Sequence, residues 1–282
     1  METLRKLQLV QYMILKDVAK LCDENNLKYY LVGGTLLGAI RHGGSIPWDD
    51  DIDIAMPRED YDKIQDIIEK NYSDKYKVQS PLNDKNYTRQ ILKVRLKGTK
   101  QLEKNMIGIE ASNEIYIDIF PLDKSKYNSG VIVALKGKMI RILFAYNTMR
   151  CGKKDDMTNF KRMIRKMCTW ITYLVPRKFV NWCFEKICTL DQNKECKYIT
   201  SFLSGLGWRK QMMLKEVYGE GVKVKYESSY FRAPKEYDVL LQSLYGDYMT
   251  PPPFDERNSG HYIAQIDFGK YGDMYEYKNS NK

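Results

Sequence analysis

The sequence has few of the residues that bind zinc or form disulfide scaffolds. Its 282 residues include two histidines and six cysteines, and no two cysteines form a Cys-x-x-Cys pair. Zinc sites are built mostly from such pairs together with histidine, so zinc is the weaker alternative here. We expect the cysteines to be buried, reduced thiols in a reducing compartment.

Long apolar runs are also missing. The best candidate for a membrane span, residues 131–145, is interrupted by Lys136, Lys138 and Arg141. The N-terminus mixes charged and apolar residues and lacks the pattern of a secretory signal. With 43% hydrophobic residues and a mean hydropathy of −0.53, the chain is expected to be a cytoplasmic protein with a sizeable core.

Most of the chain has no excess of positive or negative charge. The formal net charge is +10, and residues 130–198 hold 15 basic against 5 acidic residues, whereas the rest holds 31 of each. This segment predicts helices with a solvated face, a nucleic-acid contact or an anionic membrane contact. Aromatic residues are not regularly interleaved with the basic ones, which disfavours nucleic acid. Trp170, Phe179 and Trp182 beside basic residues favour peripheral association with an anionic membrane.

Residues 31–56 (LVGGTLLGAIRHGGSIPWDDDIDIAM) are the most informative stretch. They predict a strand, a double-glycine turn, a helix near 36–40 and a second strand over 51–56. On that strand Asp51 and Asp53 would point to the same face. Paired carboxylates on a rigid element suit Mg²⁺ (Mn²⁺ is also compatible), and Gly33 and Gly34 allow a ligand close to the backbone. A solvated acidic turn or a calcium loop is the alternative.

A third carboxylate is expected from the strand predicted over 114–120, where isoleucines alternate with Tyr116, Asp118 and Phe120. An aspartate within so apolar a strand needs a partner. A metal ion would supply one, and an ion pair with a nearby Lys or Arg on an edge strand is the alternative. Asp118 is therefore the candidate third ligand, and it could also accept the proton of an attacking hydroxyl.

Several residues are candidates for binding phosphate groups. The backbone N–H groups near Gly33, Gly34 and Thr35 precede the predicted helix and could face an anion. Arg41 could clamp a phosphate or pair with the nearby aspartates. On the strand predicted over 90–96, Lys93 and Arg95 share one face, and they could contact donor phosphates or lie in water.

Two separated motifs carry a family resemblance. The run GGTLLGAIRH…IPWDDDID resembles the signature of the LicD family, bacterial proteins that transfer phosphocholine or related phospho-alcohols from CDP-linked donors to glycans. That family is similar to the fukutin-related ribitol-phosphate transferases, within the nucleotidyltransferase fold superfamily. The second motif, residues 244–253 (LYGDYMTPPP) followed by Arg257 and His261, resembles the C-terminal signature of the family and implies that Asp247, Arg257 or His261 touches substrate.

The resemblance implies an α+β fold with a nucleotidyltransferase-like mixed sheet flanked by helices. We expect a catalytic core over 1–127, a basic helical insertion over 128–200, and a C-terminal segment over 201–282 that packs back on the core. Asp51, Asp53 and Asp118 would hold Mg²⁺ and act in catalysis.

The donor would be a CDP-alcohol, with CDP-choline favoured over CDP-glycerol and CDP-ribitol. The acceptor would be a glycan or lipid-linked glycan, such as a teichoic acid, capsule or lipopolysaccharide precursor. Alternatives are a nucleotidyltransferase that releases pyrophosphate and a non-catalytic membrane adaptor on the same fold.

Overall fold

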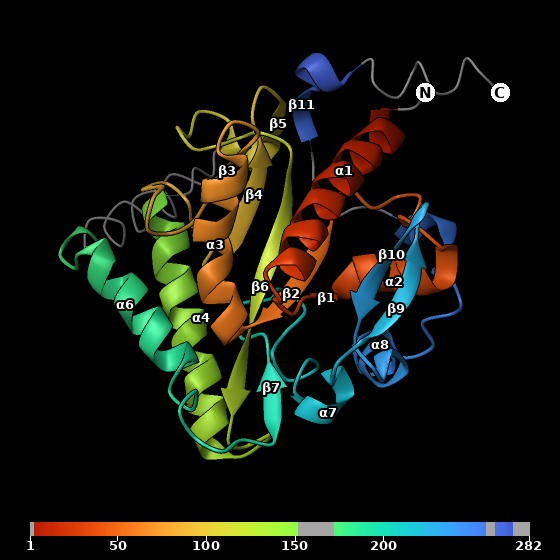
Figure 1. Cartoon of the computed structure of the whole chain (residues 1–282). Coiled ribbons are helices and arrows are strands. Elements are labelled where there is room, and N and C mark those ends of the chain that lie inside the picture. The colour runs from red at the N-terminus through yellow and green to blue at the C-terminus, as the bar shows by residue number, and fades with distance from the viewer. Residues whose placement is uncertain (1–2, 152–171, 258–262, 273–282) are drawn as a thin grey trace.

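A curled mixed sheet lies at the centre of the protein, in a computed structural model that describes residues 3–151, 172–257 and 263–272 (Figure 1). The strand order is β1-β2-β6-β4-β3, and β7 pairs with the far end of β6 and with β8. β2 and β6 run parallel, and the other neighbours run antiparallel. The strands are β1 Tyr30–Leu31, β2 Asp53–Pro57, β3 Tyr76–Gln79, β4 Leu92–Leu96, β6 Tyr116–Ser125, β7 Tyr198–Thr200 and β8 Met213–Leu214.

Two helices, α1 (Thr3–Glu24) and α3 (Arg58–Tyr72), lie side by side in front of the sheet in Figure 1. The isoleucines of β2 and β6 join the buried residues of these helices in one hydrophobic core. Side chains alternate along a strand, so the opposite face of the sheet carries Asp53 and Asp118. These two residues are direct neighbours in the parallel register of β2 and β6. The aspartates of the two strands therefore share one face.

The helix α2 (Gly33–His42) begins at the glycines themselves, not after a double-glycine turn. Gly33 has φ +57, in the left-handed region where a side chain is unfavourable. The helix ends at Gly43, whose N–H bonds to the Ala39 carbonyl. A hairpin of β9 (Val222–Tyr226) and β10 (Ser229–Ala233) packs beside it. The short helix α7 (Lys215–Tyr218) precedes this hairpin in the chain and the helix α8 (Tyr237–Tyr245) follows it, both on the same side of the molecule.

The basic segment contributes α4 (Val131–Cys151) and α6 (Arg177–Cys188), which touch through Phe144 and Phe184. The rest of the predicted helical pattern, including Met163 and Met167, lies outside the described residues. Among the helices of the described ranges, none combines the length and apolarity needed to cross a bilayer. The remaining elements are β5 Lys100–Glu103, which pairs with β11 Ile263–Asp267, and the 3-10 turns η1 Lys104–Met106, η2 Phe254–Glu256 and η3 Gly269–Tyr271.

Two predicted strands differ from the observed ones. The strand predicted over 51–56 begins only at Asp53, so Asp51 lies in the preceding loop. In the same loop the backbone carbonyls of Asp49 and Asp50 accept hydrogen bonds from glutamine side chains of α1. The strand predicted over 114–120 begins at Tyr116 and continues to Ser125, because its second half pairs with β7. The mixed sheet flanked by helices agrees with the expected architecture.

Candidate functional site

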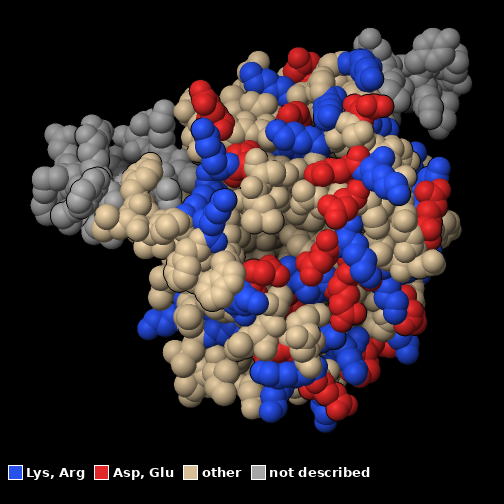
Figure 2. Space-filling view, turned by 60° about the vertical axis from the view of Figure 1, so that its left-hand side comes forward, with Lys and Arg blue, Asp and Glu red and all other residues tan. Residues whose placement is uncertain are grey.

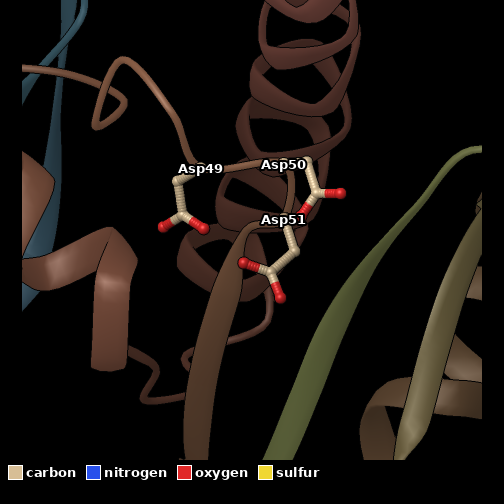
Figure 3. A group of neighbouring side chains, drawn as sticks. All are labelled: Asp49, Asp50 and Asp51. Atoms are coloured by element: carbon tan, nitrogen blue, oxygen red, sulfur yellow. The ribbon is translucent and has the colours of Figure 1, made fainter. Parts of the chain in front are cut away.

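Three consecutive aspartates form a loop between α2 and β2 (Figure 3). One carboxylate oxygen from each of Asp49, Asp50 and Asp51 lies within 4.8 Å of the others. In Figure 3 the three side chains extend to the same side of the loop, and that of Asp50 lies nearest to β6. Asp50 is buried, whereas Asp49 and Asp51 are only partly buried. The acidic loop therefore leaves two of its three carboxylates accessible.

A cavity of about 500 Å³ opens where these two carboxylates point. It is lined by the acidic side chains of Asp49, Asp51 and Asp53, but not by Asp50. Residues from α2, the tryptophan of the acidic loop and the C-terminal part of the chain complete it, namely Gly34, Leu37, Arg41, Ile46, Trp48, Leu206, Tyr245, Asp247, Tyr248, Thr250 and Pro252. Segments far apart in sequence thus meet around three carboxylates.

The two glycines at the start of α2 make room for these carboxylates. A Cβ atom on Gly33 would lie 3.2 Å from Oδ2 of Asp53, and one on Gly34 would overlap Oδ2 of Asp49. The neighbouring Thr35 is buried, and its hydroxyl accepts a hydrogen bond of 2.7 Å from the backbone N–H of Asp53. The glycines were predicted to allow a close approach to a ligand, and the groups that approach them here are the acidic side chains.

Burial and mutual repulsion raise the pKa values of Asp49 and Asp53. Desolvation, followed by the charges of Asp51, Asp118 and Asp49, raises the pKa of Asp53 well above its usual range. Desolvation and the neighbouring Asp51 raise the pKa of Asp49 to about 8. Carboxylates held this close need protons or a cation to balance their charge.

The cluster fits a divalent cation. Oδ1 of Asp53 is buried and has no hydrogen-bond partner among the described residues, which is costly unless another group supplies one. The acidic oxygens that line the cavity are hard ligands of the kind Mg²⁺ takes, together with phosphate oxygens. The residues Asp49, Asp51 and Asp53 therefore have the chemistry and the placement to hold Mg²⁺.

Asp118 is engaged differently. Both of its carboxylate oxygens accept hydrogen bonds from Nζ of Lys93, at 2.7 and 3.0 Å, and both side chains are buried. Lys93 faces Asp118 directly in the antiparallel register of β4 and β6. This is the ion-pair alternative considered for Asp118, although β6 lies inside the sheet and not at its edge. Desolvation lowers the pKa of Lys93, and the charge of Asp118 opposes that change.

Arg95 and Lys93 line a second, more enclosed cavity that also reaches Asp118. The alternative that these two side chains lie in water is wrong, because both are buried. Arg95 is buried and donates to Oε1 of Gln79 and to the Glu114 carbonyl, both at 2.6 Å. The ring of Tyr116 lies under both cations. The structure thus separates these two predicted binding residues from the cavity that Asp49 and Arg41 line.

Arg41 faces the acidic cavity and is tethered to the C-terminal segment. Its Nη1 donates to the Tyr248 carbonyl at 2.8 Å, and partial burial lowers its pKa. No ion pair joins Arg41 to the aspartates among the described residues. The ring of Trp48 lies under the guanidinium of Arg257 and against His42, which indicates that Trp48 supports the loop. Asp247 lines the cavity, and His261 lies outside the described residues.

Sequence reasoning missed three residues of this site. Gln8 donates to the Asp49 carbonyl at 2.8 Å, and Gln11 to the Asp50 carbonyl at 2.9 Å. The signal for Gln11 was its place on the apolar stripe of α1, where a polar residue needs a partner. Tyr245 lines the cavity, and burial together with the three nearby aspartates raises its pKa. It stands in the C-terminal motif, but nothing in the motif singled it out.

Comparison with known proteins gives a family match for the region that contains this site. Residues 26–129 match the family model described as "LicD/FKTN/FKRP, nucleotidyltransferase domain". The chain is 29% identical to the lipopolysaccharide cholinephosphotransferase LicD of Haemophilus influenzae over 263 residues, 92% of this chain and 96% of that protein. A shorter stretch of 57 residues is 49% identical to an uncharacterised protein of Rickettsia prowazekii, covering 20% of this chain and 21% of that one.

A stretch of 43 residues is 46% identical to the human ribitol 5-phosphate transferase FKRP, covering 15% of this chain and 9% of that protein. The family match includes α2, the acidic loop, β2, β4 and β6, and so contains every aspartate discussed above except Asp247. Residues 26–129 thus match the family model of the LicD/FKTN/FKRP nucleotidyltransferase domain, and most of the chain is similar to the LicD protein of Haemophilus influenzae.

Proposed function

We propose that this protein is a metal-dependent phosphotransferase that moves a phospho-alcohol group from a CDP-linked donor to a glycan hydroxyl and releases CMP. The observation that carries the proposal is the cavity in which Asp49, Asp51 and Asp53 meet beside the start of α2, within a LicD-family domain. The name of the Haemophilus influenzae relative gives phosphocholine and lipopolysaccharide, which supports choline as the alcohol. CDP-glycerol and CDP-ribitol are the alternative donors, and teichoic acid or capsule precursors are the alternative acceptors.

Asp51 and Asp53 are the proposed ligands of Mg²⁺. When bound, the cation would neutralise the diphosphate charge and stabilise the leaving phosphate of CMP. Asp118, predicted as the third ligand, would have to give up a bond from Lys93 to serve. Asp49 already lines the cavity, so we favour it as the third ligand.

Asp118 keeps the second role predicted for it, acceptance of the acceptor's proton. The acceptor oxygen attacks the β-phosphorus, the new O–P bond forms, and the bond from that phosphorus to the CMP oxygen breaks. The hydroxyl proton passes to the Asp118 carboxylate and then to solvent, while CMP leaves as the phosphate anion. Lys93 holds the carboxylate in place during this step, and Arg95 contacts the substrate from the second cavity.

The donor's phosphates would lie between the start of α2 and Arg41. The first N–H groups of a helix have no intrahelical partner, and those of Gly33, Gly34 and Thr35 precede the first bond of α2, from Leu36 N–H to the Val32 carbonyl. Arg41 keeps further N–H donors beside the one given to the Tyr248 carbonyl. Backbone donors and one guanidinium would therefore balance phosphate charge beside the carboxylates, in the same cavity.

The decisive experiment offers CDP-choline, CDP-glycerol, CDP-ribitol and CTP, each with Mg²⁺, and follows CMP and pyrophosphate. Release of CMP from a CDP-alcohol, absent in Asp53→Asn, supports the proposal. Pyrophosphate from CTP would identify an enzyme that transfers a nucleoside monophosphate instead. If no nucleotide is turned over, even with a glycan acceptor fraction present, the protein is an adaptor and the proposal fails.

We also propose that the protein binds peripherally to the cytoplasmic face of a membrane and binds its glycan acceptor there. A lipid-linked glycan precursor would bring the hydroxyl to that surface. The excess of 10 positive charges within residues 130–198 supports attraction to anionic lipid.

A further inference from the structure

The helix α4 presents apolar side chains to solvent along its whole length. Its buried side packs on the body of the protein, where Val133 and Ile140 are 2% exposed and Gly137 leaves space for the ring of Trp208. On the other side, Val131 is 75% exposed and Ile142 is 59% exposed. The exposed apolar residues recur at helical spacing and form one stripe, here called the α4 stripe: Val131, Ile132, Leu135, Met139, Ile142 and Met149.

Only positive charge interrupts the α4 stripe. The helix has no Asp or Glu, and its exposed Lys138 and Arg141 lie beside the apolar residues. A surface that must merely stay in solution usually mixes both signs of charge and avoids an extended apolar stripe. The chemistry of this face is therefore complementary to a surface that is apolar inside and negative outside.

The neighbouring helix α6 adds exposed aromatic residues, and its one acidic residue, Glu185, pairs with Arg58. The rings of Phe179 and Trp182 stack at 5.7 Å, and each residue is 54% exposed. Lys178 and Lys186 lie next to them and are exposed. Figure 2 brings this side of the molecule forward, and its lower left shows uncharged and basic residues with few acidic ones, whereas acidic residues gather toward the right.

We propose that the α4 stripe docks in the plane of an anionic lipid surface, with the aromatic pair of α6 as a second anchor. An interfacial helix needs an exposed apolar face, basic residues at its edge and no capacity to span. The buried side of α4 is apolar as well and packs on the protein, so its exposed side alone supplies the apolar face and the basic edge, and the helix is not long and apolar enough to span. Aromatic rings flanked by lysines suit the headgroup level. The inference supplies the membrane contact for the acceptor in the proposed function, but it does not require turnover.

The test uses the full chain and vesicles that contain equal parts of phosphatidylglycerol and phosphatidylcholine, with pure phosphatidylcholine vesicles for comparison. Co-sedimentation is measured at low and high salt. We expect binding to the anionic vesicles at least about 10-fold tighter than to the zwitterionic ones, and weakened by salt. The double variants Leu135→Ser/Ile142→Ser and Lys138→Glu/Arg141→Glu should each lower binding by about 10-fold or more.

Matched controls lie on other elements. Tyr230→Ser removes an equally exposed apolar residue from β10, and Lys225→Glu reverses an exposed charge on β9. Both should bind vesicles like the natural chain, as should Asp53→Asn, which separates docking from catalysis. Equal binding to both vesicle types, or unchanged binding by the α4 variants, overturns the proposal. So does a dimer of the natural chain in light scattering that the Leu135→Ser/Ile142→Ser variant abolishes without loss of vesicle binding.

Discussion

At the scale of single residues, each of the three aspartates of the cavity offers a carboxylate oxygen that a metal ion could use. Asp53 has a buried oxygen without a protein partner, and Asp49 and Asp51 point into the same space. Replacing any of them by Asn removes one negative ligand with little change in shape. We expect Asp51→Asn and Asp53→Asn to lower kcat by about 100-fold or more, since preorganised charge is worth that much in active sites. Nucleotide release assays with saturating Mg²⁺ measure the loss.

The same variants decide which residue is the third ligand. Titration with Mn²⁺, followed by its electron paramagnetic resonance signal, should show weakened binding in Asp49→Asn and nearly unchanged binding in Asp118→Asn. The reverse result would return Asp118 to the ligand set and remove Asp49 from it. Asp66→Asn, an exposed position on α3, is the matched control and should leave both metal binding and turnover unaltered.

The pair of Lys93 and Asp118 makes a separate prediction about stability. Both side chains are buried, and removing one member leaves an uncompensated charge in the interior. Lys93→Met should therefore lower the free energy of unfolding by about 3–5 kcal/mol. The double variant Lys93→Met/Asp118→Leu should recover most of that loss. Urea denaturation measures both changes, and Lys20→Met in the exposed pair with Glu24 should cost less than about 1 kcal/mol. An equally unstable double variant would show that the loss arises from packing and not from charge.

At the scale of elements, α1 acts as a clamp for the acidic loop. Gln8 holds the Ile46 and Asp49 carbonyls, and Gln11 joins the Asp50 carbonyl to the Tyr116 carbonyl of β6. Gln11→Met keeps the volume but leaves two buried carbonyls without their donor, at a cost of about 1–3 kcal/mol. Because the loop would then move relative to β6, we expect Mn²⁺ affinity to fall several-fold.

A merely structural role for Gln11 would not predict the loss of metal affinity. Val18→Ala, at a buried position farther along α1, should cost comparable stability through a cavity. It should leave Mn²⁺ affinity unchanged, because Val18 is remote from the acidic loop in sequence and bonds to none of its carbonyls. If both variants weaken Mn²⁺ binding equally, the clamp has no specific effect on the site.

Much of the element order follows from local patterns. The apolar spacing of α1, the acidic first turn of α3 and the alternation around Ile117 are properties of neighbouring residues, and these elements form close to where they were expected. The predicted start of β2 was wrong by two residues, and the loop before it is held by Gln8 and Gln11, some 40 positions away, which bind the Asp49 and Asp50 carbonyls. The partner of Asp118 could not be predicted either. The sequence places Lys93 on the same strand face as Arg95, but only the register of β4 with β6 places Lys93 opposite Asp118. Long-range contacts of this kind leave little trace in one sequence.

At the scale of the whole molecule, charge is divided between two regions. The acidic cavity lies among α2, β2 and the C-terminal segment, while the positive excess lies within residues 130–198, which follow β6 in the sequence. A donor with two phosphates and a divalent cation would be bound at the first region, and an anionic surface at the second. The separation allows cation binding and lipid binding to be measured independently in one protein.

The acidic cavity should also make global stability depend on pH and on Mg²⁺ together. The pKa of Asp49 is raised to about 8 and that of Asp53 is also raised well above its usual range, compared with about 3.9 in an unfolded chain. The folded state therefore binds more protons, and the contribution of this cluster to the free energy of unfolding falls as pH rises from about 4 toward 8. A cation that binds the ionised carboxylates reverses that trend, so the increase in Tm caused by Mg²⁺ should be larger at pH 8 than at pH 6. Thermal unfolding is measured at both pH values, without Mg²⁺ and with Mg²⁺ in about 100-fold excess (about 10 mM). The difference between the two increases in Tm tests this expectation. In Asp49→Asn the pH dependence should flatten relative to Asp66→Asn, and a Mg²⁺ effect that is equal at both pH values would place the cation elsewhere.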